Sequence, residues 1–419
     1  MDSTWVKTAK AGRAAGLLRG ALTADAVIIG SGLSGVTAAY LLAKAGKDVV
    51  LLTDETIADS TSAYTTGFIT ENIDTALGDL EKMFGEKRAR MIWQSGRDAI
   101  KHIEATVKRE GIECEFVRCP SYIYATDADE WKSLQKETER AKALGFKAYA
   151  RQDDRLPFKN GGYMELPNQA KFHALKYLVG LREGARKYGA RIFDNSKAKK
   201  IERKGDRYVV RTQSGSVTAA YIFVATYYPF NNPIQLFAHT GGYITYVIES
   251  NISRGRLPEA MYQDSKNPYH YFRVDRMKTH DRLIVGGEDH RREIKMDPRK
   301  NFKFLMDFMS KLLPDEKLVT KIKWKWGVIE SIDGLPLIGP LADDDTQFVA
   351  TGFSGTGMTM SRIAAEMFTD FVLGRKSKLS ELFDPRRIPT PRQLATKGAD
   401  YIGEFFGGAV KNMIRKPRA

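Results

Sequence analysis

The residues with the clearest chemical meaning are Gly30 to Gly35, which follow the pattern G-x-G-x-x-G. In such a pattern the first glycine permits a tight turn, the second lets a pyrophosphate approach the backbone, and the third lets a helix pack closely on a strand. The unpaired N–H groups at the start of that helix attract phosphate. The pattern therefore predicts a dinucleotide site, with an empty site of the same fold or a membrane-spanning helix as alternatives. The expected contacts are Gly30, Gly32, Leu33, Ser34 and Gly35.

A further contact is expected at the end of the strand that follows this helix. An acidic residue usually stands there and holds the ribose hydroxyls. Thr53 occupies that position, and Asp54 comes directly after it. Either Asp54 takes the role or Thr53 makes a weaker contact, and a surface role for Asp54 is an alternative.

Two short apolar runs, Ala26 to Ile29 and Val49 to Leu52, flank the motif on both sides. Uncharged runs of this length are typical of buried parallel strands. Residues 36–45 between them are rich in Ala and Leu and predict a helix, which Gly46 ends. The three elements form a β-α-β unit with glycines at its first turn, and this is the context that a dinucleotide motif requires.

Other elements complete the arrangement. A loop of small hydroxyl residues at 60–70 suits close approach to phosphates and ring edges. A second glycine-rich turn, at 352–359, follows a predicted strand at 347–351 and precedes a helix to about residue 373, where N–H groups could meet another electron-rich group. The remaining predicted elements are helices at 74–112, 129–144, 170–188 and 298–313, strands at 113–127, a strand meander at 190–226, and tyrosine-rich alternating strands at 241–290.

Composition limits the classes of function. The chain has 419 residues, enough for two domains, and a formal net charge of +15. The basic residues are dispersed and not interleaved with aromatic ones, so no nucleic-acid partner is expected. A solvated basic surface is favoured, with an anionic substrate or membrane surface as alternatives. Two cysteines, Cys114 and Cys119, are too few for a disulfide framework or a cysteine metal site, and no metal is expected.

No secretory signal is visible, so we expect a cytoplasmic protein. The basic, partly apolar tail from Tyr401 to Arg418 could associate weakly with a membrane surface, with an ordinary packed helix as the alternative.

Together the two glycine-rich ends resemble the D-amino-acid-oxidase-like (DAO) superfamily of FAD-dependent oxidoreductases, over about residues 20–390. The residues that carry the resemblance are Gly30, Gly32 and Gly35, the loop from Thr61-Ser62 to Thr66-Gly67, Ala225-Thr226, Asp333-Gly334-Leu335-Pro336, and Gly352 to Met358. The chain looks most similar to the branch that is often fused to a Rieske domain. Such a domain needs Cys-x-His and Cys-x-x-His pairs, and no cysteine follows Cys119, so no Rieske cluster is expected.

The resemblance implies an α/β fold with a Rossmann-like FAD-binding domain and an inserted α+β substrate domain built on a mixed or antiparallel sheet. The FAD-binding domain is expected over residues 24–80, 166–235 and 325–385, and the substrate domain over 81–165 and 236–324. Residues 1–23 form an N-terminal arm and residues 386–419 a C-terminal basic tail.

The resemblance also implies FAD, bound non-covalently because the attachment cysteine of some relatives is missing. Its pyrophosphate is expected at Gly30 to Gly35, its adenine near Ala198, and its flavin between the hydroxyl loop and the second glycine-rich turn. The further expected contacts are Thr61, Ser62, Thr65, Thr66, Gly67, Phe68, Ala225, Thr226, Gly327, Gly352, Phe353, Ser354, Gly355, Thr356, Gly357, Met358 and Thr359.

The substrate side is expected in the inserted domain. Alternation places Tyr269, Tyr271 and Arg273 on one face of a predicted strand, where Arg273 could clamp a substrate carboxylate. An exposed β-face with a surface arginine is the alternative. His270 would point the other way as a structural residue, and His290 lies either near the flavin or in a turn.

The resemblance implies an oxidoreductase that oxidises an amine or amino acid by hydride transfer to flavin N5. The electron acceptor would be oxygen, a quinone or a redox protein. One alternative is a flavin dehydrogenase that passes electrons to a quinone or separate redox protein. Another is a non-catalytic binding protein with an FAD fold.

Overall fold

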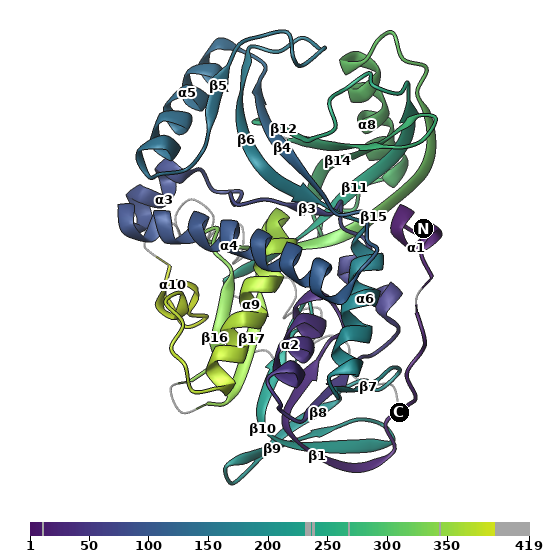
Figure 1. The fold of residues 1–419 in the computed structure, drawn as a ribbon, viewed down its shortest axis with the longest axis vertical. Helices are drawn as coiled ribbons and strands as arrows, with labels where there is room; N and C mark the ends of the chain where they lie inside the picture. Colours follow the sequence, from purple (N-terminus) through teal and green to yellow (C-terminus); the bar gives the residue numbers. More distant parts are fainter. Residues whose placement is uncertain (11, 231–235, 237–238, 267–268, 343–344, 390–419) are drawn as a thin grey trace.

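The structure is a computed structural model, and it describes residues 1–10, 12–230, 236, 239–266, 269–342 and 345–389. Two sheets, one above the other in Figure 1, form the framework. The first, sheet A, has eight strands, and its main path runs in the order β16-β17-β10-β1-β2-β7. Its strands are β1 (Gly20–Ile29), β2 (Val49–Leu52), β7 (Arg191–Phe193), β8 (Lys200–Lys204), β9 (Arg207–Arg211), β10 (Gly215–Val224), β16 (Leu337–Pro340) and β17 (Gln347–Thr351).

The centre of sheet A is parallel and covered on both sides. Strand β1 pairs in parallel with β10 and β2, so that Ile28 lies opposite Phe223 and Leu51. Helices α2 (Leu33–Lys44), α6 (Ala174–Lys187) and α9 (Gly357–Val372) lie side by side on one face (Figure 1). Successive residues of β1 enter different hydrophobic clusters, Ile28 beneath the helices and Val27 on the side of the β8–β9 hairpin. Burial on both faces explains why these strands are apolar runs instead of alternating patterns.

Sheet B has nine strands, and its main path runs in the order β15-β11-β14-β13-β12-β4-β6-β3. It is mixed, because β12 pairs in parallel with β4 while the other pairs are antiparallel. Its strands are β3 (Phe68–Ile69), β4 (Val117–Ala125), β5 (Tyr149–Arg151), β6 (Gly162–Lys171), β11 (Thr240–Ile252), β12 (Met261–Asp264), β13 (His270–Arg276), β14 (Asp281–Arg291) and β15 (Val319–Ser331). The predicted fold class, a Rossmann-like domain with a second domain on a mixed sheet, is confirmed.

Of the remaining helices, α4 lies between the two sheets and α10 lies beside β16 of sheet A (Figure 1). Helix α8 packs on β11 and β14, and α5 packs on β4 and β6. No helix within the described ranges combines the length and the apolar character that crossing a membrane requires. The bounds of these elements are α1 (Thr4–Thr8), α3 (Leu77–Phe84), α4 (Glu86–Glu110), α5 (Ala128–Ala143), α8 (Pro298–Leu312) and α10 (Ser380–Phe383).

Several elements differ from the expectation. Helix α2 begins at Leu33 instead of residue 36, directly after the glycine turn. Strand β15 was not predicted, although it pairs with β11 over most of its length. The proposed domain limits at 166 and 325 fall inside β6 and β15, both of which belong to sheet B. The membrane hypothesis for the tail concerns residues 401–418, which lie outside the described residues.

Candidate active site

One cavity of about 670 Å³ lies where the two sheets meet. Its floor comes from the carboxyl ends of the parallel strands of sheet A, at Ile29, Leu52 and Ala225. Its roof comes from sheet B, including Thr245 and Tyr271. Open α/β sheets bind ligands at the carboxyl ends of their strands, so the cavity lies where this fold places a ligand.

The glycine turn forms a cradle at one end of the cavity. A Cβ atom at Gly30 would come 2.6 Å from the carbonyl oxygen of Ala225, and one at Gly35 would come 1.9 Å from the carbonyl oxygen of Gly30. At Gly32 a Cβ atom would meet only Ser62 Oγ, at 3.5 Å, so the backbone there is open towards the cavity. Gly32 is also the N-cap of α2 and carries no side-chain cap. Gly30 and Gly35 therefore serve packing, and Gly32 leaves room for a ligand.

The expected ribose contacts both line the cavity. The hydroxyl of Ser31 donates to Thr53 Oγ1 at 2.9 Å. The carboxylate of Asp54 forms an exposed ion pair with Lys197, beside the buried Ala198. Ser62 Oγ accepts from the Leu33 N–H at 2.9 Å and thus ties the hydroxyl loop to the start of α2.

One part of the cavity has aromatic walls. Tyr64 and Trp326 stack with ring centroids 4.0 Å apart and planes at 8°. Phe68 meets Tyr271 edge to face at 5.8 Å. The second glycine-rich turn also lines the cavity, at the start of α9, where the Gly355 N–H donates to Asp74 Oδ2 at 2.6 Å.

Tyr269 and Tyr271 form a stacked pair at the substrate side, with ring centroids 5.6 Å apart. The Tyr269 hydroxyl donates to Asp289 Oδ2 at 3.2 Å, and the Tyr271 hydroxyl shares a hydrogen bond with Thr245 Oγ1 at 3.1 Å. Burial raises the pKa of Asp289 to about 6 and that of Tyr271 above the ordinary range, whereas Tyr269 is 37% exposed and keeps its phenol proton as an ordinary tyrosine does. At neutral pH the phenols are therefore neutral hydrogen-bonding groups.

The prediction that Arg273 faces the cavity is wrong. Alternation does place it on the same strand face as the tyrosines, but its side chain is only 1% exposed and lies behind the loop at 66–67. Its guanidinium donates to Asp275 Oδ1 at 2.6 Å, to the Thr66 carbonyl at 2.8 Å and to the Phe172 carbonyl at 3.0 Å. A guanidinium held in this way cannot also clamp a substrate carboxylate.

The two histidines are structural in this arrangement. His270 bonds to Asp264 and Glu288 and stacks on Phe308 at 4.1 Å. Burial acts to lower the pKa of His270, but its two carboxylate partners outweigh burial and raise it. His290 Nε2 bonds to the hydroxyl of Tyr246 at 2.9 Å, and neither histidine lines the cavity.

The other expected contacts divide into two groups. Four of them, Gly35, Gly67, Thr356 and Thr359, are not part of the cavity lining. The following residues line it: Gly30, Gly32, Leu33, Ser34, Thr53, Asp54, Thr61, Ser62, Thr65, Thr66, Phe68, Ala198, Ala225, Thr226, Gly327, Gly352, Phe353, Ser354, Gly355, Gly357, Met358, Tyr269 and Tyr271.

Some lining residues had not been selected as contacts from the sequence. They include Ser31, Tyr64, Asp74, Tyr227 and Thr245, whereas Trp326, for which the sequence left both a place at the flavin pocket and a place in the core open, also lines the cavity. Tyr64 is one of two aromatic residues in the hydroxyl loop, the other being Phe68, and this was the available signal for it. Asp74 had no signal, because it reaches Gly355 across more than 280 positions of sequence.

These features fit FAD. The open backbone at Gly32 and the uncapped start of α2 suit a pyrophosphate. A long cavity leads from there to aromatic walls that suit a flavin ring. Both cysteines are buried away from the cavity lining, at Cys114 and Cys119.

Comparison with known proteins agrees with this geometry. A family model described as FAD dependent oxidoreductase (DAO) matches residues 25–371. YhfW of Bacillus subtilis, provisionally named as a Rieske 2Fe-2S iron-sulfur protein, is 28% identical over 400 residues, which cover 94% of this chain and 77% of YhfW. Gamma-glutamylputrescine oxidoreductase of Escherichia coli is 23% identical over 390 residues, 89% of each chain.

Solved structures share the fold. Glycine oxidase from Geobacillus kaustophilus matches 88% of this chain and 100% of its own, with a TM-score of 0.75 at 18% identity. L-proline dehydrogenase from P. horikoshii matches 88% of this chain and 98% of its own, with a TM-score of 0.74 at 17% identity.

Proposed function

The chain belongs to the DAO family of FAD-dependent oxidoreductases, and from that premise we propose that it oxidises a small amine at the carbon next to nitrogen. The names of several similar proteins support this reaction class. Gamma-glutamylputrescine oxidoreductase, glycine oxidase and L-proline dehydrogenase each refer to an amine or an amino acid.

The observation that carries the proposal is the continuity of the cavity. The glycine cradle at Gly32 and the tyrosine pair Tyr269–Tyr271 line the same space. Non-covalently bound FAD would accept a hydride at N5 from the carbon that carries the nitrogen. The aromatic side chains would exclude water from the substrate, and the two neutral phenols would orient it through hydrogen bonds.

The charges around the cavity favour an amine over an amino acid. Among the described lining residues Lys197 is the one cationic side chain, and it lies at the ribose end, paired with Asp54. The substrate side has the carboxylate of Asp74 in its lining and that of Asp289 behind Tyr269. A carboxylate substrate would find no cation there among these residues, whereas an ammonium group would meet acidic partners.

The test is an anaerobic donor screen of the purified yellow protein. Matched donor pairs that differ by one carboxylate are methylamine and glycine, pyrrolidine and proline, and phenethylamine and phenylalanine. We expect the amines to bleach the flavin absorption at lower concentrations than their carboxylate partners. Preferential bleaching by the amino acids would overturn the amine preference, and bleaching by no nitrogen compound would overturn the reaction class in favour of a non-catalytic binding protein.

The second candidate function is that of a dehydrogenase with a separate electron acceptor. The similarity to YhfW favours it, because the name of YhfW refers to an iron–sulfur protein. In that case the protein is a dehydrogenase that passes electrons to a quinone or to an iron–sulfur protein. Measuring quinone reduction and oxygen consumption with the same donor decides between the two acceptors. Rapid quinone reduction with little oxygen consumption supports the dehydrogenase.

A further inference from the structure

The N-terminal arm reaches the loop that lines the flavin side of the cavity. The Ser3 hydroxyl donates to the Ala63 carbonyl, and Trp5 Nε1 donates to the Thr65 carbonyl, each at 2.5 Å. The arm precedes residue 25, where the match to the family model begins. A segment outside the matched family region is thus bonded to the hydroxyl loop at 60–70.

Two other side chains bind the neighbouring carbonyls of the same loop, at residues 64 and 66. Trp324 Nε1 donates to the Tyr64 carbonyl at 2.9 Å, and Arg273 donates to the Thr66 carbonyl at 2.8 Å. Four consecutive carbonyls, at residues 63–66, therefore each accept a hydrogen bond from a side chain. None of the four donors belongs to the lining of the cavity, whereas residues 64–66 do line it.

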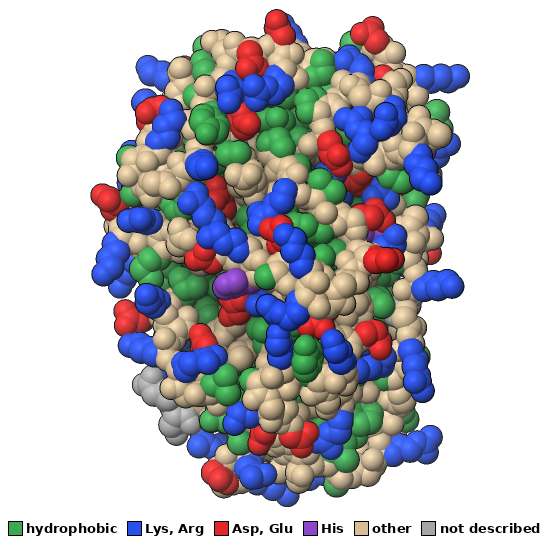
Figure 2. Space-filling view, viewed as in Figure 1, with side chains coloured by type: hydrophobic (Ala, Val, Ile, Leu, Met, Phe, Trp, Pro, Cys, Tyr) green, Lys and Arg blue, Asp and Glu red, His purple; other side chains and the backbone are tan. Residues whose placement is uncertain are grey.

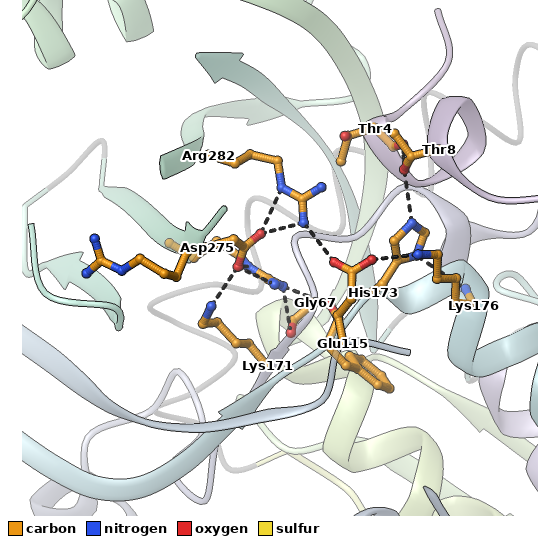
Figure 3. Close-up of polar contacts among 12 residues, drawn as sticks. Thr4, Thr8, Gly67, Glu115, Lys171, His173, Lys176, Asp275 and Arg282 are labelled. Carbon is orange, nitrogen blue, oxygen red and sulfur yellow. Dashed lines mark hydrogen bonds and ion pairs between the residues drawn. The ribbon is translucent and has the colours of Figure 1, made fainter. Parts of the chain in front are cut away.

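Trp5 is built into a buried ionic cluster. Its indole is fully buried, and the guanidinium groups of Arg273 and Arg282 lie 5.2 Å and 5.1 Å from its ring centroid. Figure 3 shows Asp275 between Arg282 and Lys171, with Gly67 nearby. Burial alone would raise the pKa of Asp275, but the surrounding cations hold it well below its usual range. The cluster therefore stays charged and fixes the position of the indole.

The arm is anchored on its other side as well. Thr8 Oγ1 and His173 Nε2 are hydrogen-bonded at 3.0 Å (Figure 3), and the Trp5 and His173 rings lie 4.8 Å apart. Burial lowers the pKa of His173 to about 4, so this histidine is neutral at physiological pH. These contacts keep Trp5 in place independently of the cavity.

We propose that Trp5 is a positioning residue for the cofactor. In a trans peptide the carbonyl and the next N–H point in opposite directions. Because Trp5 holds the Thr65 carbonyl on the side away from the cavity, the Thr66 N–H is presented to bound flavin. The Arg273 bond fixes the next peptide, whose Gly67 N–H donates to Thr65 Oγ1 at 3.1 Å. The arm thus pre-orders a hydrogen-bond donor that a free loop would offer only part of the time.

The test compares two Trp→Phe variants of the holoenzyme. Trp5→Phe removes the indole N–H but keeps an aromatic ring. Trp93→Phe is the matched control, because Trp93 is also buried and meets Phe146 edge to face at 5.3 Å, and its Nε1 has no acceptor among the described residues. The readouts are FAD release from diluted holoenzyme, followed by flavin fluorescence, and hydrogen exchange of the amides at 65–67.

We expect Trp5→Phe to bind FAD about fivefold more weakly and to exchange these amides faster by a similar factor, since one neutral hydrogen bond is lost. Trp93→Phe should match the wild type in both measurements. Ser3→Ala, which frees the neighbouring Ala63 carbonyl, should shift both readouts in the same direction as Trp5→Phe.

Wild-type FAD release and amide exchange in Trp5→Phe would overturn the proposal. So would equal effects of Trp5→Phe and Trp93→Phe, because these would show a general loss of stability. The test requires bound FAD but no substrate, so a failed donor screen leaves its outcome valid.

Discussion

Asp289 has its position because of a local irregularity in sheet B. The pairing of β11 with β14 shifts register between Ile244 and Tyr246, and Glu288 on the opposite strand has a φ of 56°. Bulges of this kind redirect side chains and often lie beside active sites. Here the irregularity directs Glu288 to His270 and Asp289 to the hydroxyl of Tyr269.

The first prediction concerns pH. Burial raises the pKa of Asp289 to about 6, so the carboxylate is neutral below that pH and ionised above it. A cationic amine should bind better to the ionised form, and we expect KM to fall about fivefold between pH 5 and pH 7.5. The amine itself stays protonated across this range. Steady-state kinetics of Asp289→Asn provide the control, in which KM should be flat; a fall of equal size in that variant would exclude Asp289 as the cause.

The two thiols give a second prediction. Burial raises the pKa of Cys114 to about 12 and that of Cys119 to about 11. Because the thiolate is the reactive form, neither should react with a thiol reagent in the native holoenzyme. A colorimetric thiol titration should find no reactive group before denaturation and two after it. One fast-reacting thiol in the native protein would contradict the burial of these residues.

Arg273 illustrates what a residue pattern can and cannot predict. Alternation along the strand correctly placed Arg273 on the same face as Tyr269 and Tyr271. The pattern carries no information on the loop at 66–67, which covers only part of that face. This loop lies close to Arg273, because a Cβ atom added at Gly67 would come within 2.8 Å of the guanidinium. Arg273 therefore supports the loop from behind and does not act as the expected clamp for a substrate carboxylate.

At the scale of elements, the structure of the glycine turn predicts different effects for substitutions at Gly35 and Gly32, which the sequence motif alone does not distinguish. A Cβ atom at Gly35 would collide with the Gly30 carbonyl, whereas one at Gly32 has space in the protein itself. Gly35→Ala should destabilise the fold by about 2 kcal/mol. Gly32→Ala should keep the thermal midpoint of the FAD-free protein and weaken FAD binding by at least about tenfold, because it fills the place that a pyrophosphate needs.

Thermal unfolding and FAD titration of both variants measure these two effects. We expect opposite patterns in the two variants: Gly35→Ala mainly loses thermal stability, and Gly32→Ala mainly loses affinity for FAD. If Gly32→Ala binds FAD as tightly as the wild type, the pyrophosphate does not lie against this turn.

Elements with strong local signals were predictable, and elements defined by distant pairing were not. Strand β2 is fully buried over Val49–Leu52, as its uncharged run indicated. Strand β15 did carry a local signal that the prediction missed, because exposed lysines alternate with less exposed residues in its first half, and its place in the sheet comes from pairing with β11, about 80 positions earlier. The contact of the arm had no such signal, because Trp5 meets a partner loop 60 positions later.

At the scale of the molecule, the two sheets enclose one cavity, and the arm supports one of its loops from outside. The arm runs along both sheets: the Leu18 N–H donates to Ser196 Oγ at 2.9 Å beside sheet A, and Trp5 lies against Arg273 of sheet B. The hydroxyl loop is bonded to this arm through Ser3 and Trp5. This arrangement explains why residues so far apart in sequence act on one ligand.

The surface charge makes the last prediction. Figure 2 shows Lys and Arg scattered over the visible face, with Asp and Glu between them. A dispersed charge of +15 should bind anionic vesicles at low salt and lose them at about 0.15 M salt, because its interactions are screened beyond a Debye length. Deleting residues 390–419 lowers the charge only to +11, since they hold six basic and two acidic residues. Co-sedimentation with the vesicles should therefore give nearly the same salt dependence for both chains. Binding that survives 0.5 M salt in the full chain and disappears in the shortened one would instead assign an apolar anchor to the tail.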